Sequence, residues 1–239
     1  MLLSTNAIVL SKLKYRDNDL IVKCYTEQLG LVSFLLRGVF KSKKGSSKIA
    51  YFQLLSQLQL QIDYKENRSL QRIKEVKLHQ LYTSLHANIY KSSIVMFLAE
   101  VLANTLKEEE QNNNLFSYIE TTLLWLDAQS EYSNFHLLFL LNLTKYLGFY
   151  PEEIYSSYNY FNLLDGKFET KQYGKYTVSG ENLTLLKTLL GTTFDGLSSV
   201  KINAKQRQSF LSMILLYFEL HLGSFKTPKS LQIFNQVFS

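Results

Sequence analysis

The stretch QLQLQIDY, residues 57–64, gives the clearest indication of a fold class anywhere in the chain. Polar and apolar residues alternate through it, with Leu58, Leu60 and Ile62 on one side. Successive side chains of a β-strand point to opposite faces, so this pattern predicts a strand with one buried face. A turn at residues 66–69 leads into residues 70–82, where the periodicity is less clear and a strand followed by a helix fits.

The segments upstream of this strand also predict β-structure. They are apolar and rich in β-branched residues, and Gly30 suits the positive φ of a hairpin turn at residues 27–30. About five strands in so short a region favour a small barrel, because a barrel leaves no free sheet edge. We expect the five-stranded OB-fold, with an SH3-like barrel as the alternative. The upstream strands are predicted over residues 7–13, 20–26 and 31–39.

Charge divides the chain into two parts. Residues 1–80 hold 14 Lys and Arg against 6 Asp and Glu, a net charge of +8. Residues 81–239 hold 12 against 14, a net charge of −2. The 239 residues suffice for two small domains, and the asymmetry predicts that the basic one faces a polyanion. We therefore expect a two-part α+β protein, with the barrel over residues 1–82 and an α-helical domain over residues 83–239.

The basic part contains a loop without acidic residues. RGVFKSKKGSSK, residues 37–48, carries five cations, and no Asp or Glu occurs from Gln28 to Ile62. Like charges on one loop repel each other, which favours phosphate binding over a merely solvated loop. Among the nearby aromatic residues, Phe34 and Phe52 are expected in the core and Phe40 on the surface. The candidate DNA-binding residues are Arg37, Lys41, Lys43, Lys44, Lys48, Lys23 and Arg16, helped by Lys12 and Lys14, with Phe40 as a surface for base stacking.

From about residue 83 the apolar residues recur every three or four positions, which predicts helices. Ser133 or Asn134 is expected to cap one helix, and Gly148 to end it. Asp165-Gly166 predicts a hairpin turn between apolar residues. The further expected helices cover residues 94–102, 115–126, 183–190 and 203–222, the last as the central helix of an all-α bundle.

Catalytic and metal-binding patterns are absent from the sequence. Its single cysteine, Cys24, excludes both an internal disulfide and a cysteine-based zinc finger. Glycine-rich phosphate loops and a GxSxG elbow are missing. The four histidines, His79, His86, His136 and His221, form no HExxH or HxH pair. We expect a binding protein without a cofactor, not an enzyme.

Targeting signals are also absent from the sequence. The first residues lack the basic region of a signal peptide, and no apolar run approaches the length of a membrane span. We expect a soluble, cytoplasmic protein that does not contact the membrane.

A series of short motifs runs along the whole chain. Near the start these are Ala7–Leu10, Tyr15, Asp19, Ile21-Val22, Tyr25-Thr26, Gly30 and Arg37-Gly38, and near the end they are His221–Gly223 and Lys229–Leu231. In order and spacing this series resembles the RecO family of bacterial DNA repair proteins. The resemblance implies an N-terminal OB-fold and a helical C-terminal domain, in agreement with the expectation from the residues.

The resemblance also implies a function. It implies a recombination mediator, associated with the nucleoid, that binds single- and double-stranded DNA and anneals complementary strands. The implied partners are RecR and the single-stranded-DNA-binding protein, with RecA loaded as the indirect result. We expect the acidic tail of the single-stranded-DNA-binding protein on the helical part, where Lys226 and Lys229 would hold its carboxylates. An OB-fold protein that binds RNA is the alternative, because phosphate is the main contact in both cases.

One departure from the family concerns zinc. Many RecO proteins carry a four-cysteine zinc module in the helical domain, whereas residues 150–178 of this chain contain no cysteine. We expect a hairpin near residues 158–170 to replace the metal by aromatic packing, and no zinc to be bound. The aromatic residues in question are Tyr158, Tyr160, Phe161 and Phe168.

Overall fold

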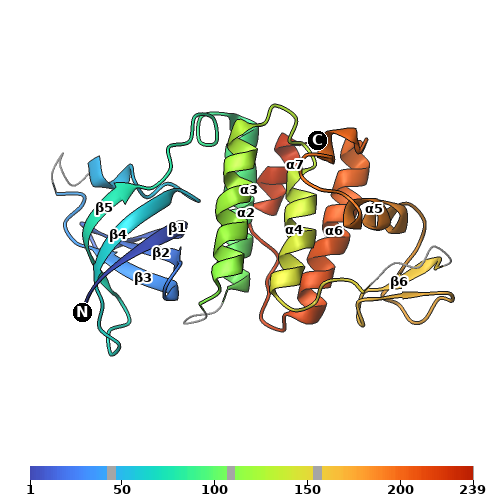
Figure 1. Ribbon diagram of the computed structural model, residues 1–239, viewed down its shortest axis with the longest axis horizontal. Helices are drawn as coiled ribbons and strands as arrows, with labels where there is room; N and C mark the ends of the chain where they lie inside the picture. The colour runs from blue at the N-terminus through green and yellow to red at the C-terminus, as the bar shows by residue number, and fades with distance from the viewer. Residues whose placement is uncertain (42–46, 107–110, 153–157, 239) are drawn as a thin grey trace. The chain divides into compact units, whose positions relative to one another are not determined.

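The computed structural model describes residues 1–41, 47–106, 111–152 and 158–238. The chain forms two compact units, Met1–Ala128 and Gln129–Ser239. Figure 1 shows an antiparallel sheet at the start of the chain and mainly helices after it, which confirms the two-part α+β organisation. The division after Ala128 lies later than the predicted domain boundary at residue 82, and that boundary stays a prediction.

The first unit contains one five-stranded antiparallel sheet with the order β3-β2-β1-β4-β5. The alternating stretch forms β4 as predicted, and Leu58, Leu60 and Ile62 point into the core. Phe34 and Phe52 are buried in the same core, also as predicted. Of the strand and helix that fitted residues 70–82, the strand forms as β5 and no helix follows within this stretch. The strands are β1 (Leu2–Tyr15), β2 (Asp19–Thr26), β3 (Gly30–Leu36), β4 (Gln57–Asp63) and β5 (Arg72–Leu78).

The edge strands β3 and β5 meet at a single bridge. Phe34 pairs in parallel with Gln71, whose N–H donates to the Ser33 carbonyl at 2.8 Å and whose carbonyl accepts from the Leu35 N–H at 3.0 Å. From Arg72 onward β5 pairs with β4 alone among the described strands. The predicted closed barrel is therefore corrected to an open sheet, because the pairing between its edges stops where β5 begins.

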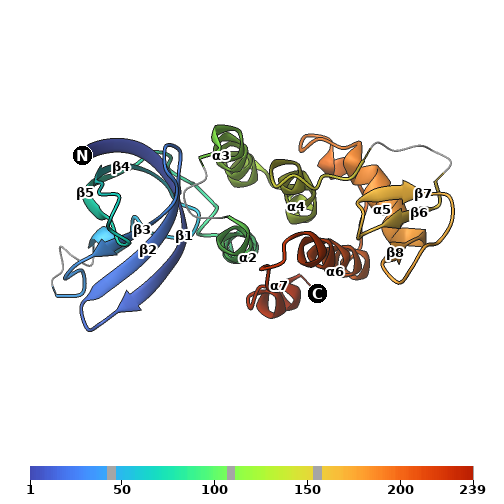
Figure 2. The ribbon, with the colours of Figure 1, turned by 90° about the horizontal axis from the view of Figure 1, so that it is seen from below.

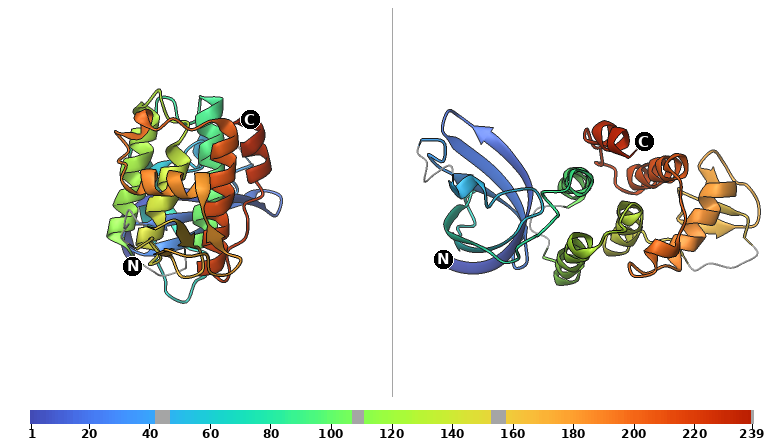
Figure 3. Two further views of the ribbon diagram at one scale, coloured as in Figure 1. Left: turned by 90° about the vertical axis from the view of Figure 1, so that its right-hand side faces the viewer. Right: turned by 90° about the horizontal axis from the view of Figure 1, so that it is seen from above.

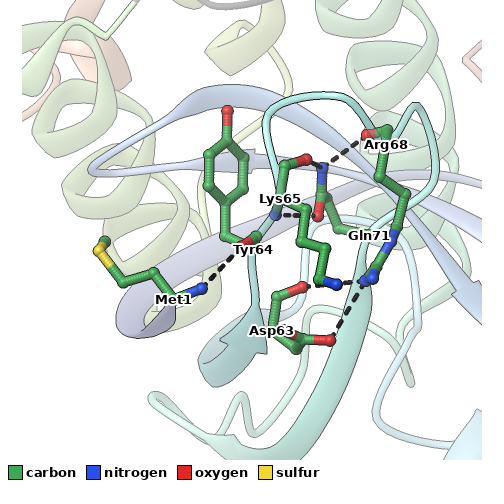
Figure 4. A network of polar contacts seen from close by, with 6 residues as sticks. All are labelled: Met1, Asp63, Tyr64, Lys65, Arg68 and Gln71. Carbon is green, nitrogen blue, oxygen red and sulfur yellow. Dashed lines mark hydrogen bonds and ion pairs between the residues drawn. The ribbon is translucent and has the colours of Figure 1, made fainter.

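Gln71 holds the turn between β4 and β5 in shape. Its side chain is 3% exposed. Its Oε1 accepts from the Lys65 N–H, and its Nε2 donates to the carbonyls of Lys65 and Arg68 at 2.8 and 2.6 Å (Figure 4). Arg68 in turn forms an ion pair with Asp63 at 3.3 Å, and its hydrogen bond lowers the pKa of that carboxyl. One buried amide thus fixes both the turn and the bridge between the sheet edges.

Helices α2 (Ile89–Thr105) and α3 (Asn113–Ala128) belong to the same unit as the sheet. Tyr25 on β2 packs 6.0 Å from Phe116 on α3, and the Gln57 side chain on β4 donates to the Glu120 carbonyl at 2.9 Å. Gln57 is consequently buried although it belongs to the polar side of the alternating stretch. The apolar stripe predicted within residues 115–126 is confirmed, since its members are buried on α3.

Asp127 at the end of α3 fastens the segment that leads into α2. Its carboxylate accepts hydrogen bonds from the backbone N–H groups of Thr83, Ser84 and Leu85 at 2.6–2.8 Å. Burial by itself raises the pKa of this carboxyl, but these donors outweigh burial and lower the pKa to about 2. The carboxylate is therefore the form that holds the segment in place.

The second unit combines four helices with a small sheet in its described residues. Figure 3 shows α4 and α6 end-on, and they lie side by side. Nearly every residue of α4 is buried, whereas α6 exposes one face, so the central helix is α4 and the prediction for residues 203–222 is wrong in this respect. The helices are α4 (Phe135–Tyr146), α5 (Gly180–Leu190), α6 (Ala204–His221) and α7 (Leu231–Val237), with a 3-10 turn η1 (Leu197–Ser199).

The predicted helix ends are partly confirmed. Gly148 follows α4 with a φ of +84°, as expected of a glycine that ends a helix. Asn134 occupies the N-cap position of α4 but its side chain makes no capping hydrogen bond there. Its amide donates instead to the Val200 carbonyl at 2.9 Å, so it ties α4 to the segment after η1.

The predicted hairpin is part of a three-stranded sheet, so the second unit is not all-α. Strands β6 (Tyr160–Asn162), β7 (Lys167–Glu169) and β8 (Thr177–Val178) pair in the order β7-β6-β8 (Figure 2). The rings of Phe161 and Phe168 lie 4.8 Å apart, and Phe161 is 5.8 Å from Tyr217 on α6. The expected aromatic packing is confirmed for this pair, and the absence of zinc stays a prediction. No described helix is long and apolar enough to cross a membrane.

Candidate nucleic-acid interface

The loop after β3 folds back onto the turn between β1 and β2. The Gly38 N–H donates to the Asp19 carboxylate at 2.8 Å, and the Phe40 N–H donates to the Asn18 carbonyl at 3.3 Å. Gly38 has a φ of +65°, which lets the chain reverse at this point. Asp19, one of the few acidic residues nearby, is thereby engaged by the backbone. The fold-back brings the start of the basic loop to the end of the β1–β2 hairpin.

Two lysines of β1 lie on the same face of the hairpin as this loop. A bulge between Val9 and Ser11 shifts the register, so that Lys12 stands opposite Val22 and Lys14 opposite Leu20. Residues opposite each other in an antiparallel pair share a face, so both lysines lie on the face that is buried further along the strands. At their end of the hairpin this face is not covered, and the side chains of Lys12 and Lys14 are exposed.

Phe40 lies on the surface as predicted, and it contacts one of these lysines. Its ring is 41% exposed, and the Lys14 ammonium lies 5.7 Å from the ring centre. Such a distance is within the range of a cation–π contact. Arg37 and Lys41 flank Phe40 in the chain and are exposed as well. The structure therefore brings together a basic and aromatic cluster of Lys12, Lys14, Arg37, Phe40 and Lys41.

Arg16 occupies the hairpin turn itself. It has a φ of +53°, and its guanidinium lies 5.2 Å from the Tyr15 ring centre. Positive φ is uncommon for a residue other than glycine, and it directs this side chain away from the regular path of β1. Among the described residues, no cation of the cluster forms an ion pair, and neither does Arg16.

The other predicted residues lie apart from the cluster. Lys23 stands between Ser11 and Ser33 in the ladder, on the opposite face of β2 from Leu20 and Val22. Lys48 follows residues 42–46, which lie outside the described residues, and it lines a groove beside β5. Lys43 and Lys44 fall outside the described residues. The single loop site predicted from the sequence is thus spread over two faces of the sheet and one groove.

Two cations that the sequence reasoning did not single out line the same groove as Lys48. Lys74 and Lys77 on β5 are exposed and lie across from it. The stretch RIKEVKL, residues 72–78, does carry three cations, but a bulge at Lys74 breaks its alternation. The irregular period left the bounds and the faces of this strand undefined, and with them the position of these lysines.

The partner-binding lysines remain a prediction. Lys226 and Lys229 are exposed in the segment that joins α6 to α7. Thr227, between them, donates to the Glu219 carboxylate at 2.6 Å. A groove in the second unit, about 360 Å³ in volume, is lined by Lys201 and Arg207 and by neither of these two lysines. Within the described residues, no three His, Cys, Asp or Glu side chains gather as a metal-ligand set.

A sheet unit whose exposed basic cluster forms no ion pair among the described residues, followed by a mainly helical unit, defines a two-part α+β protein suited to a polyanionic ligand. The family model of the recombination protein O N terminal matches residues 1–82, and that of the recombination protein O C terminal matches residues 86–231. The chain belongs to the RecO family.

Relatives of the full length support this assignment. The chain is 48% identical over 238 residues to the DNA repair protein RecO of Christiangramia forsetii. It is 43% identical over 239 residues to that of Flavobacterium johnsoniae and 37% identical over 243 residues to that of Bacteroides fragilis. Each comparison covers 100% of both chains, so the resemblance seen in the sequence motifs is confirmed.

Proposed function

We propose that the chain is a DNA repair protein of the recombination mediator type, which binds DNA on the basic surface of its sheet unit. The names of its full-length relatives support the repair role. The observation that carries the binding site is the fold-back of the loop after β3, which places Phe40 beside Lys14, while neither Lys14 nor Lys41 forms an ion pair among the described residues. The phosphates of the DNA backbone would supply the negative charge that pairs with these lysines.

Strand annealing follows from contacts of this kind. Lysine and arginine side chains that bind phosphates position a strand without reading its sequence. The repulsion between two complementary strands falls, while their base edges stay free to pair. Phe40 supplies a ring for stacking, a contact worth about 1–3 kcal/mol per base in proteins that bind single strands.

The strand order supports an OB-fold as the scaffold of this surface. The order β3-β2-β1-β4-β5, with a parallel bridge between β3 and the residue before β5, fits a five-stranded Greek-key barrel that is partly open. We assign residues 1–82 to this domain. Helices α2 and α3 then cover part of its outside, as the contact between Tyr25 and Phe116 indicates.

The proposed partners follow from the family. We infer that the protein acts in the cytoplasm with RecR to help load RecA onto strands coated by the single-stranded-DNA-binding protein. The acidic tail of that protein would bind the helical part, with Lys226 and Lys229 near its carboxylates. The exposure of both lysines supports this proposal.

Fluorescence anisotropy of a labelled single-stranded oligonucleotide tests the DNA site. If about five phosphates are neutralised, the logarithm of the binding constant falls against the logarithm of salt concentration with a slope of about −3.5. The variant Lys12→Ala/Lys14→Ala/Lys41→Ala is expected to bind more weakly, with a slope of about −1.4. The matched control, Lys171→Ala/Lys175→Ala/Lys205→Ala, removes three exposed lysines of the second unit and should leave the slope unchanged.

Three results would count against the proposal. Equal slopes for wild type and the Lys12/Lys14/Lys41 variant would remove the cluster as the binding site. A slope near zero for the wild type would remove electrostatic capture altogether. Competition by matched RNA at lower concentration than DNA would favour the alternative, an RNA-binding protein.

A further inference from the structure

The open seam between β3 and β5 leaves a groove on each side of the Phe34–Gln71 bridge. The first groove, about 580 Å³, lies beside the turn between β4 and β5, and its charged side chains are Glu66 and Arg68. The second groove, about 480 Å³, lies along β5, and its charged side chains are Lys48, Lys74, Glu75 and Lys77. The first is electrically balanced and the second carries a net charge of +2.

The wall of the second groove is an unpaired strand edge. Residues 73–77 of β5 line it, and β5 pairs only with β4 among the described strands. At about 3.3 Å per residue these five residues offer roughly 16 Å of edge, enough for a short added strand. Backbone N–H and C=O groups along such an edge form a template for another extended chain.

The floor of the groove is apolar. Leu36 at the end of β3 and Val39 in the loop after it line the groove with Ile73 and Val76 from β5. The buried Phe52 lines it as well. Side chains of an added strand alternate between the floor and solvent, so every second residue of a ligand would meet this surface. An extended segment with alternating apolar residues matches it.

The lysines at the rim determine which segment fits. Among the described residues, Lys48, Lys74 and Lys77 form no ion pair. Lysine on an edge strand disfavours pairing with neutral or basic strands, because its charge loses water without a partner. Acidic residues on the solvent side of the added strand remove this penalty.

We propose that this groove binds an extended acidic segment of a partner protein, which adds to β5 as a further antiparallel or parallel strand. The site differs from the cluster around Phe40 in its residues, and it uses backbone pairing in addition to charge. The proposal does not rest on the DNA-binding function.

Binding of a short fluorescein-labelled peptide, in which Asp alternates with Ile, to the full chain tests the proposal by anisotropy. Three changes are expected to weaken it by at least about tenfold: Lys74→Glu/Lys77→Glu in the protein, Lys in place of Asp in the peptide, and N-methylation of alternate amides along the pairing edge of the peptide. Lys65→Glu, an exposed lysine on the turn outside both grooves, is the matched control and should leave the affinity unchanged.

The remaining arms separate this site from other peptide and nucleic-acid sites. Unchanged affinity in Lys226→Glu/Lys229→Glu supports the groove, and a loss there comparable to that in Lys74→Glu/Lys77→Glu would overturn it. Equal binding of the methylated peptide would overturn strand addition. Displacement of the peptide by an oligonucleotide that the Lys12/Lys14/Lys41 variant no longer binds would also overturn it, since the peptide would then occupy the DNA site.

Discussion

Buried polar side chains carry the most specific information at the scale of single residues. His136 on α4 is 1% exposed, and its ring packs edge-on at 4.8 Å against Phe234 on α7. Burial lowers the pKa of the His136 imidazole to about 3, and the positive charge of Arg207 acts in the same direction. The folded protein therefore keeps this ring neutral at pH values where an unfolded chain protonates it.

This difference predicts a loss of stability at mildly acidic pH. An unfolded histidine titrates near pH 6.5, so the contribution of neutral His136 is complete above that pH and falls as the pH is lowered toward 3. We expect the free energy of unfolding to fall by about 2 kcal/mol between pH 6.5 and pH 5. Urea denaturation followed by circular dichroism measures it.

A folded His136→Leu variant provides the comparison. It should lose this part of the pH dependence, because leucine takes up no proton. Asp127 does not contribute to the change in the free energy of unfolding between pH 6.5 and pH 5, since its lowered pKa of about 2 affects stability only in more acidic solution. An identical pH profile in both proteins would contradict the assignment.

At the scale of elements, the turn of the β6–β7 hairpin is fitted against α6. Gly166 in this turn has a φ of +69°, and a Cβ atom there would lie 2.7 Å from the Tyr217 hydroxyl. That hydroxyl donates to the Phe149 carbonyl at 2.7 Å and is held by the bond. Gly174 has the same φ of +69° but nothing within 4 Å of the corresponding position.

The two glycines allow backbone strain and close packing to be separated. Alanine at either position adopts a left-handed conformation at a cost of about 1 kcal/mol. Gly166→Ala must also displace the Tyr217 hydroxyl, so we expect it to lower the free energy of unfolding by at least about 1 kcal/mol more than Gly174→Ala. Equal losses by chemical denaturation would show that Tyr217 moves aside freely.

Prediction from the sequence succeeded where a pattern depends on one element alone. Alternation at residues 57–64 gave β4 and its buried face, and Asp165-Gly166 gave the β6–β7 turn. It failed where a second element decides the outcome. Gln57 is buried because α3 covers it, and α4 rather than α6 is central because most of its residues are buried, where α6 exposes one face. The same holds for the candidate sites. The exposure of Phe40 could be predicted from its place in a loop, whereas Lys74 lies near Lys48 only because the fold brings β5 to the loop.

At the scale of the whole molecule, the boundaries in sequence and in space differ. The family models divide the chain between residues 82 and 86, whereas the compact units divide after Ala128. Tyr25 and Leu31 on the sheet are buried, and Tyr25 contacts Phe116 and the Asn112 carbonyl on the far side of the family boundary. The sheet therefore packs against helices that the family models assign to the other part of the chain.

Two fragments test this dependence. We expect residues 1–128 to unfold cooperatively, and residues 1–82 to be less stable by at least about 3 kcal/mol, since full exposure of a large apolar side chain costs about 1.5–3 kcal/mol. Thermal unfolding followed by circular dichroism compares them. Equal melting temperatures would show that residues 1–82 are an independent domain and that α2 and α3 merely rest on it.

The single bridge between Phe34 and Gln71 divides the open seam of the sheet into two parts. The edges of the sheet are paired only at this bridge among the described residues, and one groove lies on each side of it. The bridge separates the two grooves, so a ligand in one groove cannot extend into the other without breaking it. Gln71 is hydrogen-bonded to β3 and to its own turn, so the bridge is held from two sides. The open seam thus offers two short binding stretches in place of one long one, and the length of any strand added along β5 is limited at Gln71.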